Sequence, residues 1–264
     1  MLQTRIEAAK RAVMAQTALL HREFGRAESR WKSDGTRVTA VDIAISENIF
    51  GELRAQFPDD QYFSEELAGA TDPIPLTARF AWVLDPIDGT NNFALGIPYC
   101  AISLALVERG EPVYGVIYDL ARRTLMHGGP GFGVHNGDHL GHALDVAPNP
   151  ESIVGMHSPS DKSLLPLVVG IVSSFKIRGL GSATLHLAYV AVGLFDGTVD
   201  FNVKIWDLAA AIALCRAAGA EVRFLNGEQL PMRQFDLKMK RIVYFSAGPA
   251  MFDRLAKLLK PTPV

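Results

Sequence analysis

The sequence has few cysteines and no surplus of charge of either sign. Its two cysteines, Cys100 and Cys215, lie in apolar runs, which favours buried free thiols over a disulfide. They do not form a pair of the kind that binds zinc, and the seven histidines are scattered without a metal-ligand spacing. A formal net charge of −2 gives no electrostatic reason to expect a nucleic acid or an anionic membrane as a partner.

Long apolar runs are also missing. No stretch reaches the length of a membrane span, and residues 1–30 lack the uninterrupted apolar core of a signal peptide, so we expect a cytoplasmic protein. There is no Walker-type Gly-x-x-x-x-Gly-Lys motif, which argues against a P-loop enzyme that hydrolyses nucleotides.

The overall composition is typical of a globular protein, since 48% of the 264 residues are hydrophobic and 20% are charged. This length suits one large domain or two compact lobes. The pattern predicts an amphipathic helix over residues 3–28, a second helix capped by Thr39, and then mostly strands. Helices and strands alternate beyond a proline-containing stretch over residues 143–152. We therefore predict an α+β lobe over residues 1–144 and an α/β lobe over residues 145–264.

One predicted strand leads into a pair of carboxylates. Residues 80–84 have the character of a buried strand, and Asp85 and Asp88 follow with Pro86 between them. Proline cannot extend a ladder, so the chain must turn there and can point both carboxylates into one space. Two such carboxylates repel each other unless a cation lies between them, and oxygen ligands favour magnesium, manganese or calcium over zinc. The alternative is a surface turn with solvated carboxylates.

Two neighbouring segments could contribute further groups to a site around Asp85 and Asp88. Thr90, after Gly89, can open a short helix, and the free N–H groups at a helix start bind phosphate oxygens. The pair Glu65-Glu66 follows a predicted strand over residues 61–64. The alternative for this pair is a solvated acidic patch.

Two segments of the second half could also contribute. Asp207 begins a predicted helix over residues 207–218, where it is either a ligand facing the lobe junction or an ordinary N-cap. Residues 179–182, Gly-Leu-Gly-Ser, form a glycine-rich turn between a strand and a helix. This turn either contacts the substrate or only caps the helix.

At these positions the sequence resembles the inositol monophosphatase family. Residues 82–93, Trp-Val-Leu-Asp-Pro-Ile-Asp-Gly-Thr-Asn-Asn-Phe, resemble its first signature, and residues 206–210, Trp-Asp-Leu-Ala-Ala, resemble its second. Residues 32–42 and the pair Glu65-Glu66 are also similar, in the same order along the chain. The resemblance implies an α+β fold, a layered α/β/α/β/α sandwich of two lobes. It also implies a homodimer, and many members are inhibited by lithium.

The resemblance further implies a set of site residues. It implies two to three magnesium ions, with manganese as an alternative, held by Glu65, Asp85, the carbonyl of Ile87, Asp88 and Asp207. It implies that Glu65, Thr90 and Asp42 take part in catalysis, with Thr90 orienting the attacking water and residues 32–39 forming a mobile flap. Substrate contacts are implied for Asp88, Gly89, Thr90, Gly181, Ser182 and Asp200.

The implied activity is hydrolysis of a small phosphorylated metabolite, with myo-inositol monophosphate as the first candidate. Histidinol phosphate and 3′(2′),5′-bisphosphate nucleotides are alternatives, because Asn91, Asp200 and Lys204 depart from residues common in the family. Some members are thought to bind transcription or ribosome-assembly machinery. A binding protein is therefore an alternative of another class, although the near-neutral charge speaks against direct RNA binding.

Overall fold

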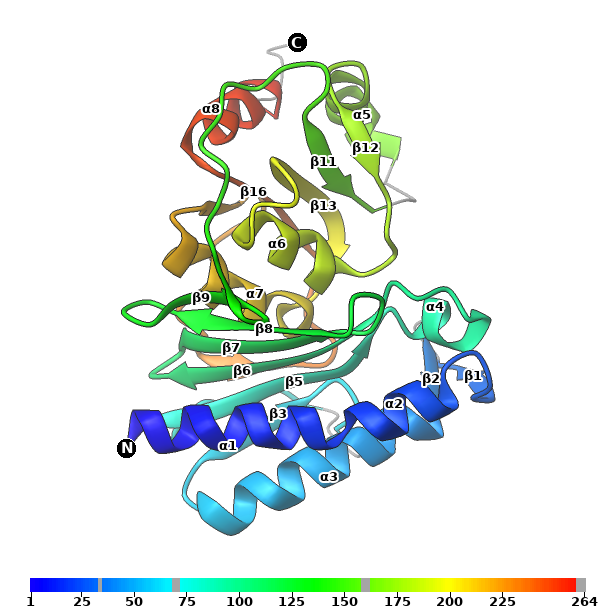
Figure 1. Cartoon of the computed structure of the whole chain (residues 1–264), viewed down its shortest axis with the longest axis vertical. Helices are drawn as coiled ribbons and strands as arrows, with labels where there is room; N and C mark the ends of the chain where they lie inside the picture. The colour runs from blue at the N-terminus through cyan, green and yellow to red at the C-terminus, as the bar shows by residue number, and fades with distance from the viewer. Residues whose placement is uncertain (33–34, 68–71, 158–161, 260–264) are drawn as a thin grey trace.

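The fold is a stack of helical layers and sheets. The structure is a computed structural model that describes residues 1–32, 35–67, 72–157 and 162–259. In Figure 1 an outer helical layer lies below a large sheet, two helices separate this sheet from a smaller one, and further helices cover the far side. This order confirms the predicted α/β/α/β/α sandwich.

The bounds of the elements are as follows. The helices are α1 (Leu2–Ala15), α2 (Thr17–Glu23), α3 (Ala40–Gln56), α4 (Thr90–Leu95), the 3₁₀ helix η1 (Lys162–Leu164), α5 (Leu165–Val172), α6 (Ala183–Ala191), α7 (Ile205–Ala218) and α8 (Pro249–Leu258). The strands are β1 (Ser29–Trp31), β2 (Arg37–Thr39), β3 (Gln61–Ser64), β4 (Ile74–Pro75), β5 (Phe80–Asp88), β6 (Ala101–Glu108), β7 (Glu111–Asp119), β8 (Thr124–Gly129), β9 (Gly133–Asn136), β10 (His139–Gly141), β11 (Ile153–Met156), β12 (Lys176–Arg178), β13 (Gly197–Val203), β14 (Glu221–Phe224), β15 (Gln234–Phe235) and β16 (Ile242–Ala247).

The larger sheet has the order β10-β9-β8-β7-β6-β5-β3 among the described residues. Its pairs are antiparallel except for β3 and β5, which run parallel. Every residue of β5 is buried, because α1 and α3 cover one face of the sheet and α6 and α7 lie against the other (Figure 1). A strand covered on both faces lacks polar alternation, and residues 80–84 of β5 are all apolar before Asp85.

The helices between the sheets are apolar on every side. All of α6 is buried, and so is most of α7, as expected for helices in the interior. Helix α7 approaches β7 very closely at Gly115, where a Cβ atom would lie 2.1 Å from the carbonyl oxygen of Ala210. Glycine is therefore needed at this position for the middle layer to pack on the larger sheet.

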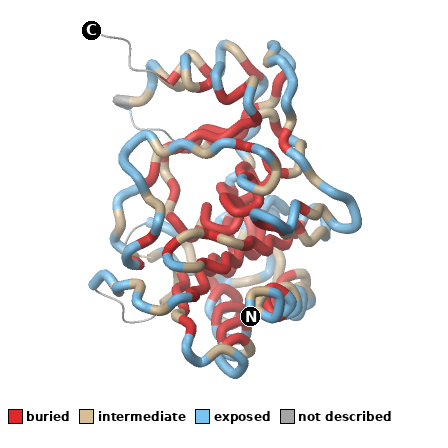
Figure 2. Tube along the Cα trace, turned by 90° about the vertical axis from the view of Figure 1, so that its left-hand side faces the viewer, coloured by how far each residue is buried: buried red, intermediate tan, exposed pale blue. Residues whose placement is uncertain are grey.

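The smaller sheet has the order β12-β11-β13-β16-β14 in the described part of the chain, with β11 parallel to both of its neighbours. Buried apolar side chains form three clusters between the layers. Figure 2 shows the buried residues gathered inside the molecule, with exposed residues along the outer helices and loops. Within the described residues, no helix combines the length and apolar character needed to cross a membrane.

Several expectations are confirmed at the level of single elements. Thr39 caps α3, and its hydroxyl accepts from the N–H groups of Val41 and Asp42. Strands β6 and β7, within the part predicted to be mostly strands, form an antiparallel hairpin. Cys100 and Cys215 are both buried and free.

Two predicted boundaries are wrong. The helix predicted over residues 3–28 is divided into α1 and α2, and the Thr17 hydroxyl donates to the carbonyl of Met14 at the break, a local bond that competes with helix continuation. The strand predicted to end at residue 84 continues to Asp88. Pro86 removes one donor from the ladder, and the pairing with β6 shifts register between Asp85 and Asp88 instead of ending.

Candidate active site

Two acidic residues leave the larger sheet at the same edge. Strands β3 and β5 are parallel, with Ser64 opposite Leu84, so the residues that follow, Glu65 and Asp85, emerge side by side. The N–H of Glu65 also donates to the carbonyl of Leu84 over 3.2 Å. Parallel pairing therefore explains why acids twenty positions apart reach one place.

Three aspartates form the centre of the site. Carboxylate oxygens of Asp85, Asp88 and Asp207 all lie within 4.8 Å of one another. Burial raises the pKa of Asp85 well above its ordinary value, and the negative charges of Glu65, Asp88 and Asp207 raise it further. Burial and the neighbouring carboxylates raise the pKa of Asp207 in the same way. The group is therefore costly to ionise without a compensating cation.

Asp207 is held by the start of α7, but it is not the N-cap. It is the third helical residue, and its Oδ2 accepts the backbone N–H of Lys204, the N-cap, over 2.7 Å. This bond fixes the carboxylate at the helix start, where negative charge is favourable.

The chemistry of this group fits a hard divalent cation. The hydrogen bonds described for Asp85 and Asp88 come from neutral donors, namely the N–H of Ile87, the Ser182 hydroxyl and the N–H of Thr184. Such donors orient carboxylates but do not cancel their charge. Closely spaced oxygen ligands suit magnesium or manganese, so these residues could hold the metal that the sequence predicts.

Glu65 lies beside Asp85 but is not one of the three residues whose oxygens all lie within 4.8 Å of one another. Its Oε1 lies 2.7 Å from the ammonium nitrogen of Lys32, which also contacts Oε1 of Glu66 at 2.5 Å. Burial raises the pKa of Glu65 to about 7, and Lys32 opposes that rise. A metal ion at Glu65 would therefore compete with the Lys32 ammonium. Residues 33 and 34 of the predicted flap lie outside the described residues.

Thr90 and Asp42 meet beside the aspartates. The Thr90 hydroxyl lies 3.2 Å from Oδ1 of Asp42 and 2.9 Å from the carbonyl oxygen of Ile87. The other oxygen of Asp42 belongs to the capping box of α3, where it accepts from the N–H and hydroxyl of Thr39. Burial raises the pKa of Asp42 to about 6 despite these donors. The structure thus brings together a hydroxyl and a carboxylate that are predicted to act in catalysis.

Gly89 makes the turn from β5 into α4. Its φ of +90° is left-handed, and a Cβ atom there would lie 2.9 Å from the carbonyl oxygen of Tyr99. Only glycine meets both conditions without strain. The helix starts at Thr90 as predicted, so backbone N–H groups of residues 89 and 90 lie next to the aspartates.

The start of α6 holds Asp88 from the other half of the chain. The Ser182 hydroxyl donates to Oδ2 of Asp88 over 2.5 Å, and the N–H of Thr184 donates to the same oxygen over 2.7 Å. Ser182 also caps α6 by accepting from the N–H of Leu185. Gly181 precedes it with a φ of +76°. Ser182 is fully buried, so the described contacts of this residue are structural ones.

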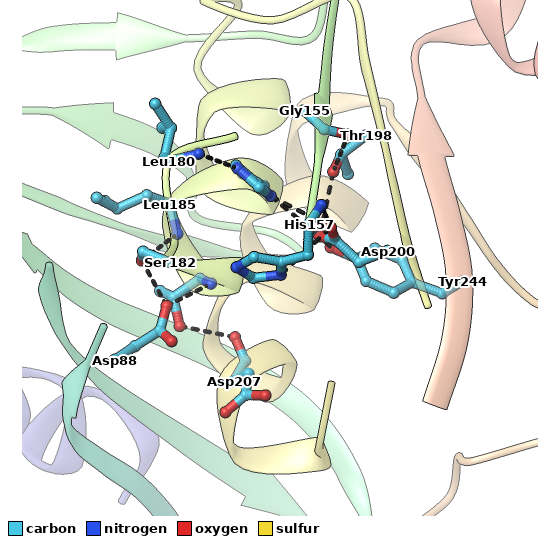
Figure 3. A network of polar contacts seen from close by, with 12 residues as sticks. Asp88, Gly155, His157, Leu180, Ser182, Leu185, Thr198, Asp200, Asp207 and Tyr244 are labelled. Atoms are coloured by element: carbon cyan, nitrogen blue, oxygen red, sulfur yellow. Dashed lines mark hydrogen bonds and ion pairs between the residues drawn. The ribbon is translucent and has the colours of Figure 1, made fainter. Parts of the chain in front are cut away.

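Asp200 is, like Ser182, a predicted substrate contact that is fully buried. It lies on β13 and is surrounded by donors (Figure 3). Burial would raise the pKa of Asp200, but His186 and His157 outweigh this effect and hold it well below its ordinary value. Neither histidine is predicted from the sequence to be a site residue. The only signal was positional, because β11 pairs with β13 so that Met156 lies opposite Val199, which puts His157 next to Asp200.

Known proteins are similar to this chain in both sequence and fold. An inositol-1-monophosphatase of Mesorhizobium japonicum is 33% identical over 231 residues, which cover 82% of this chain and 86% of that protein. A Nus factor SuhB of Pasteurella multocida is 33% identical over 205 residues, which cover 74% of each chain. The crystal structure of the extragenic suppressor protein SuhB from Bartonella henselae has a TM-score of 0.85 at 26% identity and covers 98% of this chain and 99% of its own. The sequence model of the inositol monophosphatase family matches residues 1–261, and the chain belongs to that family.

Proposed function

We propose that this protein hydrolyses a small phosphate monoester with a metal-activated water. Family membership supports a phosphoric monoester hydrolase. The observation that carries the proposal is the group of Asp85, Asp88 and Asp207, of which the first two are buried and whose oxygens lie within 4.8 Å of one another. Such a group has no structural purpose in a folded core unless a cation balances it.

The residues have separate tasks in this reaction. Asp85, Asp88 and Asp207 would hold magnesium, or manganese in its place, and Glu65 would hold a further ion. When bound, the metal neutralises phosphate charge, lowers the pKa of a water and stabilises the leaving oxygen. Thr90 orients the water. The Thr90 hydroxyl can in turn pass a proton to the carboxylate of Asp42.

Phosphate itself would be positioned by backbone groups. The N–H groups of Gly89 and Thr90 start α4 beside the aspartates. Because the chain as a whole is not basic, the positive potential that binds a dianion must come from the metal and from these oriented dipoles. No residue is needed as a covalent nucleophile.

The test is release of inorganic phosphate from a panel of esters in the presence of magnesium. The panel contains inositol 1-phosphate, histidinol phosphate and 3′-phosphoadenosine 5′-phosphate, with Asp88→Asn as the inactive control. We expect turnover of at least one ester and none by the variant. If no ester releases phosphate with magnesium or manganese, or if Asp88→Asn retains activity, the proposal is wrong.

A second role is favoured by one finding, the 33% identity to a relative named Nus factor SuhB. That name makes a partner connected with transcription a second candidate for this chain. The two roles separate in cells that lack the native gene. An Asp88→Asn protein that restores growth and co-purifies with RNA polymerase would favour the binding role over catalysis.

A further inference from the structure

His157 lies between the aspartate group and Asp200. Figure 3 shows its ring with Asp200 on one side and with Asp88 and Ser182 on the other. Its Nδ1 is 3.3 Å from Oδ1 of Asp200, and its backbone N–H donates to the same oxygen over 2.6 Å. The histidine is therefore anchored twice by one carboxylate.

Asp200 has no oxygen left for a substrate. Besides His157, its carboxylate is met by the His186 ring at 3.2 Å, the Tyr244 hydroxyl at 3.2 Å and the Thr198 hydroxyl at 3.4 Å. It is 0% exposed. A ligand at the aspartates would therefore meet His157 first, and Asp200 only through it.

His157, His186 and Asp200 could be mistaken for a metal site, since their nitrogen and oxygen atoms lie within 4.8 Å of one another. The backbone N–H of Leu180 donates to Nε2 of His186 over 2.9 Å, so this nitrogen carries no proton. The proton is then on Nδ1, which faces Asp200. Both nitrogens of His186 are in use, and the trio positions His157 instead of binding a metal.

The free edge of His157 faces the site. Its side chain is 21% exposed, and among the described residues its Nε2 has no hydrogen-bond partner. The carboxylates of Asp200, Asp88 and Asp207 outweigh the effect of burial and raise the pKa of His157 to about 9. The neighbouring ring of His186 lies at a centroid distance of 4.7 Å, and its Nδ1 is directed at Asp200. Paired with the Asp200 carboxylate through Nδ1, the protonated ring presents its Nε2–H to the site.

We propose that His157 contacts the alcohol half of the substrate, that Asp200 is a positioning residue acting through it, and that the site favours an alcohol half carrying negative charge. The proposal rests on the proposed phosphatase function and specifies its substrate class. Of the expected substrates, it favours a bisphosphate, whose second phosphate can accept from His157. It disfavours histidinol phosphate, whose alcohol half carries an ammonium group.

Three esters of similar size test this directly, because they differ mainly in the charge of the alcohol half. These are phosphoglycolate with a carboxylate, 2-hydroxyethyl phosphate with a hydroxyl, and phosphoethanolamine with an ammonium. With magnesium present, we expect kcat/KM to fall in that order. His157→Gln keeps a donor but removes the charge, and should lower the ratio of phosphoglycolate to phosphoethanolamine by about tenfold, the effect of one charge-assisted hydrogen bond.

Asp200→Asn should lower the same ratio, and the double variant should lower it no further, because both changes remove one interaction. Should Asp200→Asn not fold, NMR titration of His157 in the wild type decides the role of Asp200. A value well above about 6.5 supports the anchor, and an ordinary value contradicts it.

The outcomes separate this proposal from the proposed function. If none of the three esters nor p-nitrophenyl phosphate is hydrolysed, the phosphatase function fails. If they are hydrolysed but the wild type prefers phosphoethanolamine, or His157→Gln leaves the ratio unchanged, the role of His157 is wrong and the phosphatase function stands.

Discussion

The hydroxyl of Thr90 lies 3.2 Å from Oδ1 of Asp42 and 2.9 Å from the carbonyl oxygen of Ile87. A hydroxyl has one proton and can donate to only one of these oxygens at a time. Its own lone pairs stay available to a water beside the aspartates. The pair can therefore take a proton from water at Thr90 and deliver one to Asp42.

Replacing Thr90 by Val tests this pathway, because Val keeps the branched shape and loses the hydroxyl. We expect kcat to fall about 10²-fold, the lower end of what a positioned acid–base group contributes. Thr90→Ser keeps the hydroxyl and should retain most of the activity. A Val variant with kcat close to that of the wild type would exclude Thr90 from the proton path, provided that its magnesium dependence is unchanged.

The stability of the metal-free protein should depend on pH in an unusual direction. Burial raises the pKa of Asp42 to about 6 and that of Glu65 to about 7, whereas in the unfolded chain both lie near 4. The folded state thus binds these protons more tightly. The resulting stabilisation is complete below about pH 4 and is lost as the pH rises to about 7.

Thermal unfolding in EDTA should therefore occur at a lower temperature at about pH 7.5 than at about pH 5. Excess magnesium should reverse this loss, because a cation bound only by the folded state stabilises it, by about 2.7 kcal/mol at one hundred times Kd. The increase should be larger at the higher pH, where the carboxylates are ionised. Equal magnesium effects at both pH values would contradict the link between these acids and the metal.

Asp85→Asn should have opposite effects on activity and on stability. The amide oxygen can still accept the N–H of Ile87, but a metal ligand and a source of repulsion are lost. We expect activity to fall about 10³-fold, or about 4 kcal/mol of transition-state stabilisation. In EDTA the unfolding temperature should rise.

Asp119 provides a matched control for this variant. It is also a fully buried aspartate, but it accepts from the Tyr189 hydroxyl over 2.7 Å and is not one of the clustered aspartates. Asp119→Asn weakens a charge-assisted hydrogen bond, so its unfolding temperature should fall while the magnesium-dependent activity remains. If both variants shift stability in the same direction, repulsion at Asp85 is not the cause.

The parts of this structure that were predictable from sequence are local ones. Thr39 caps its helix through bonds to residues two and three positions away, and Pro86 perturbs the strand in which it lies. The grouping of Asp85 with Asp88 follows from the same short segment. Such features depend only on residues close by in the sequence, so they can be predicted without knowledge of the fold.

The contacts of Asp200 depend on longer distances along the chain. His157, which directly follows β11, reaches it through strand pairing, and His186 reaches it from α6. Neither histidine lies at a spacing along the chain that indicates a site. His157 meets Asp200 only through the register of β11 on β13, and that register is set by packing against the middle helices. The lobe boundary after residue 144 stays a prediction, and α7 contacts both sheets.

Ser182→Ala should separate metal affinity from helix stability. The hydroxyl caps α6 and donates to Asp88, so its loss removes a cap worth about 1 kcal/mol and one bond that orients a metal ligand. We expect a modestly lower unfolding temperature and magnesium affinity weakened about 10- to 100-fold, as for other residues that orient ligands. Ser182→Thr keeps the hydroxyl and should recover the affinity. Because Ser182 is buried, KM at saturating magnesium should change little in the Ala variant, whereas a direct substrate contact would raise it.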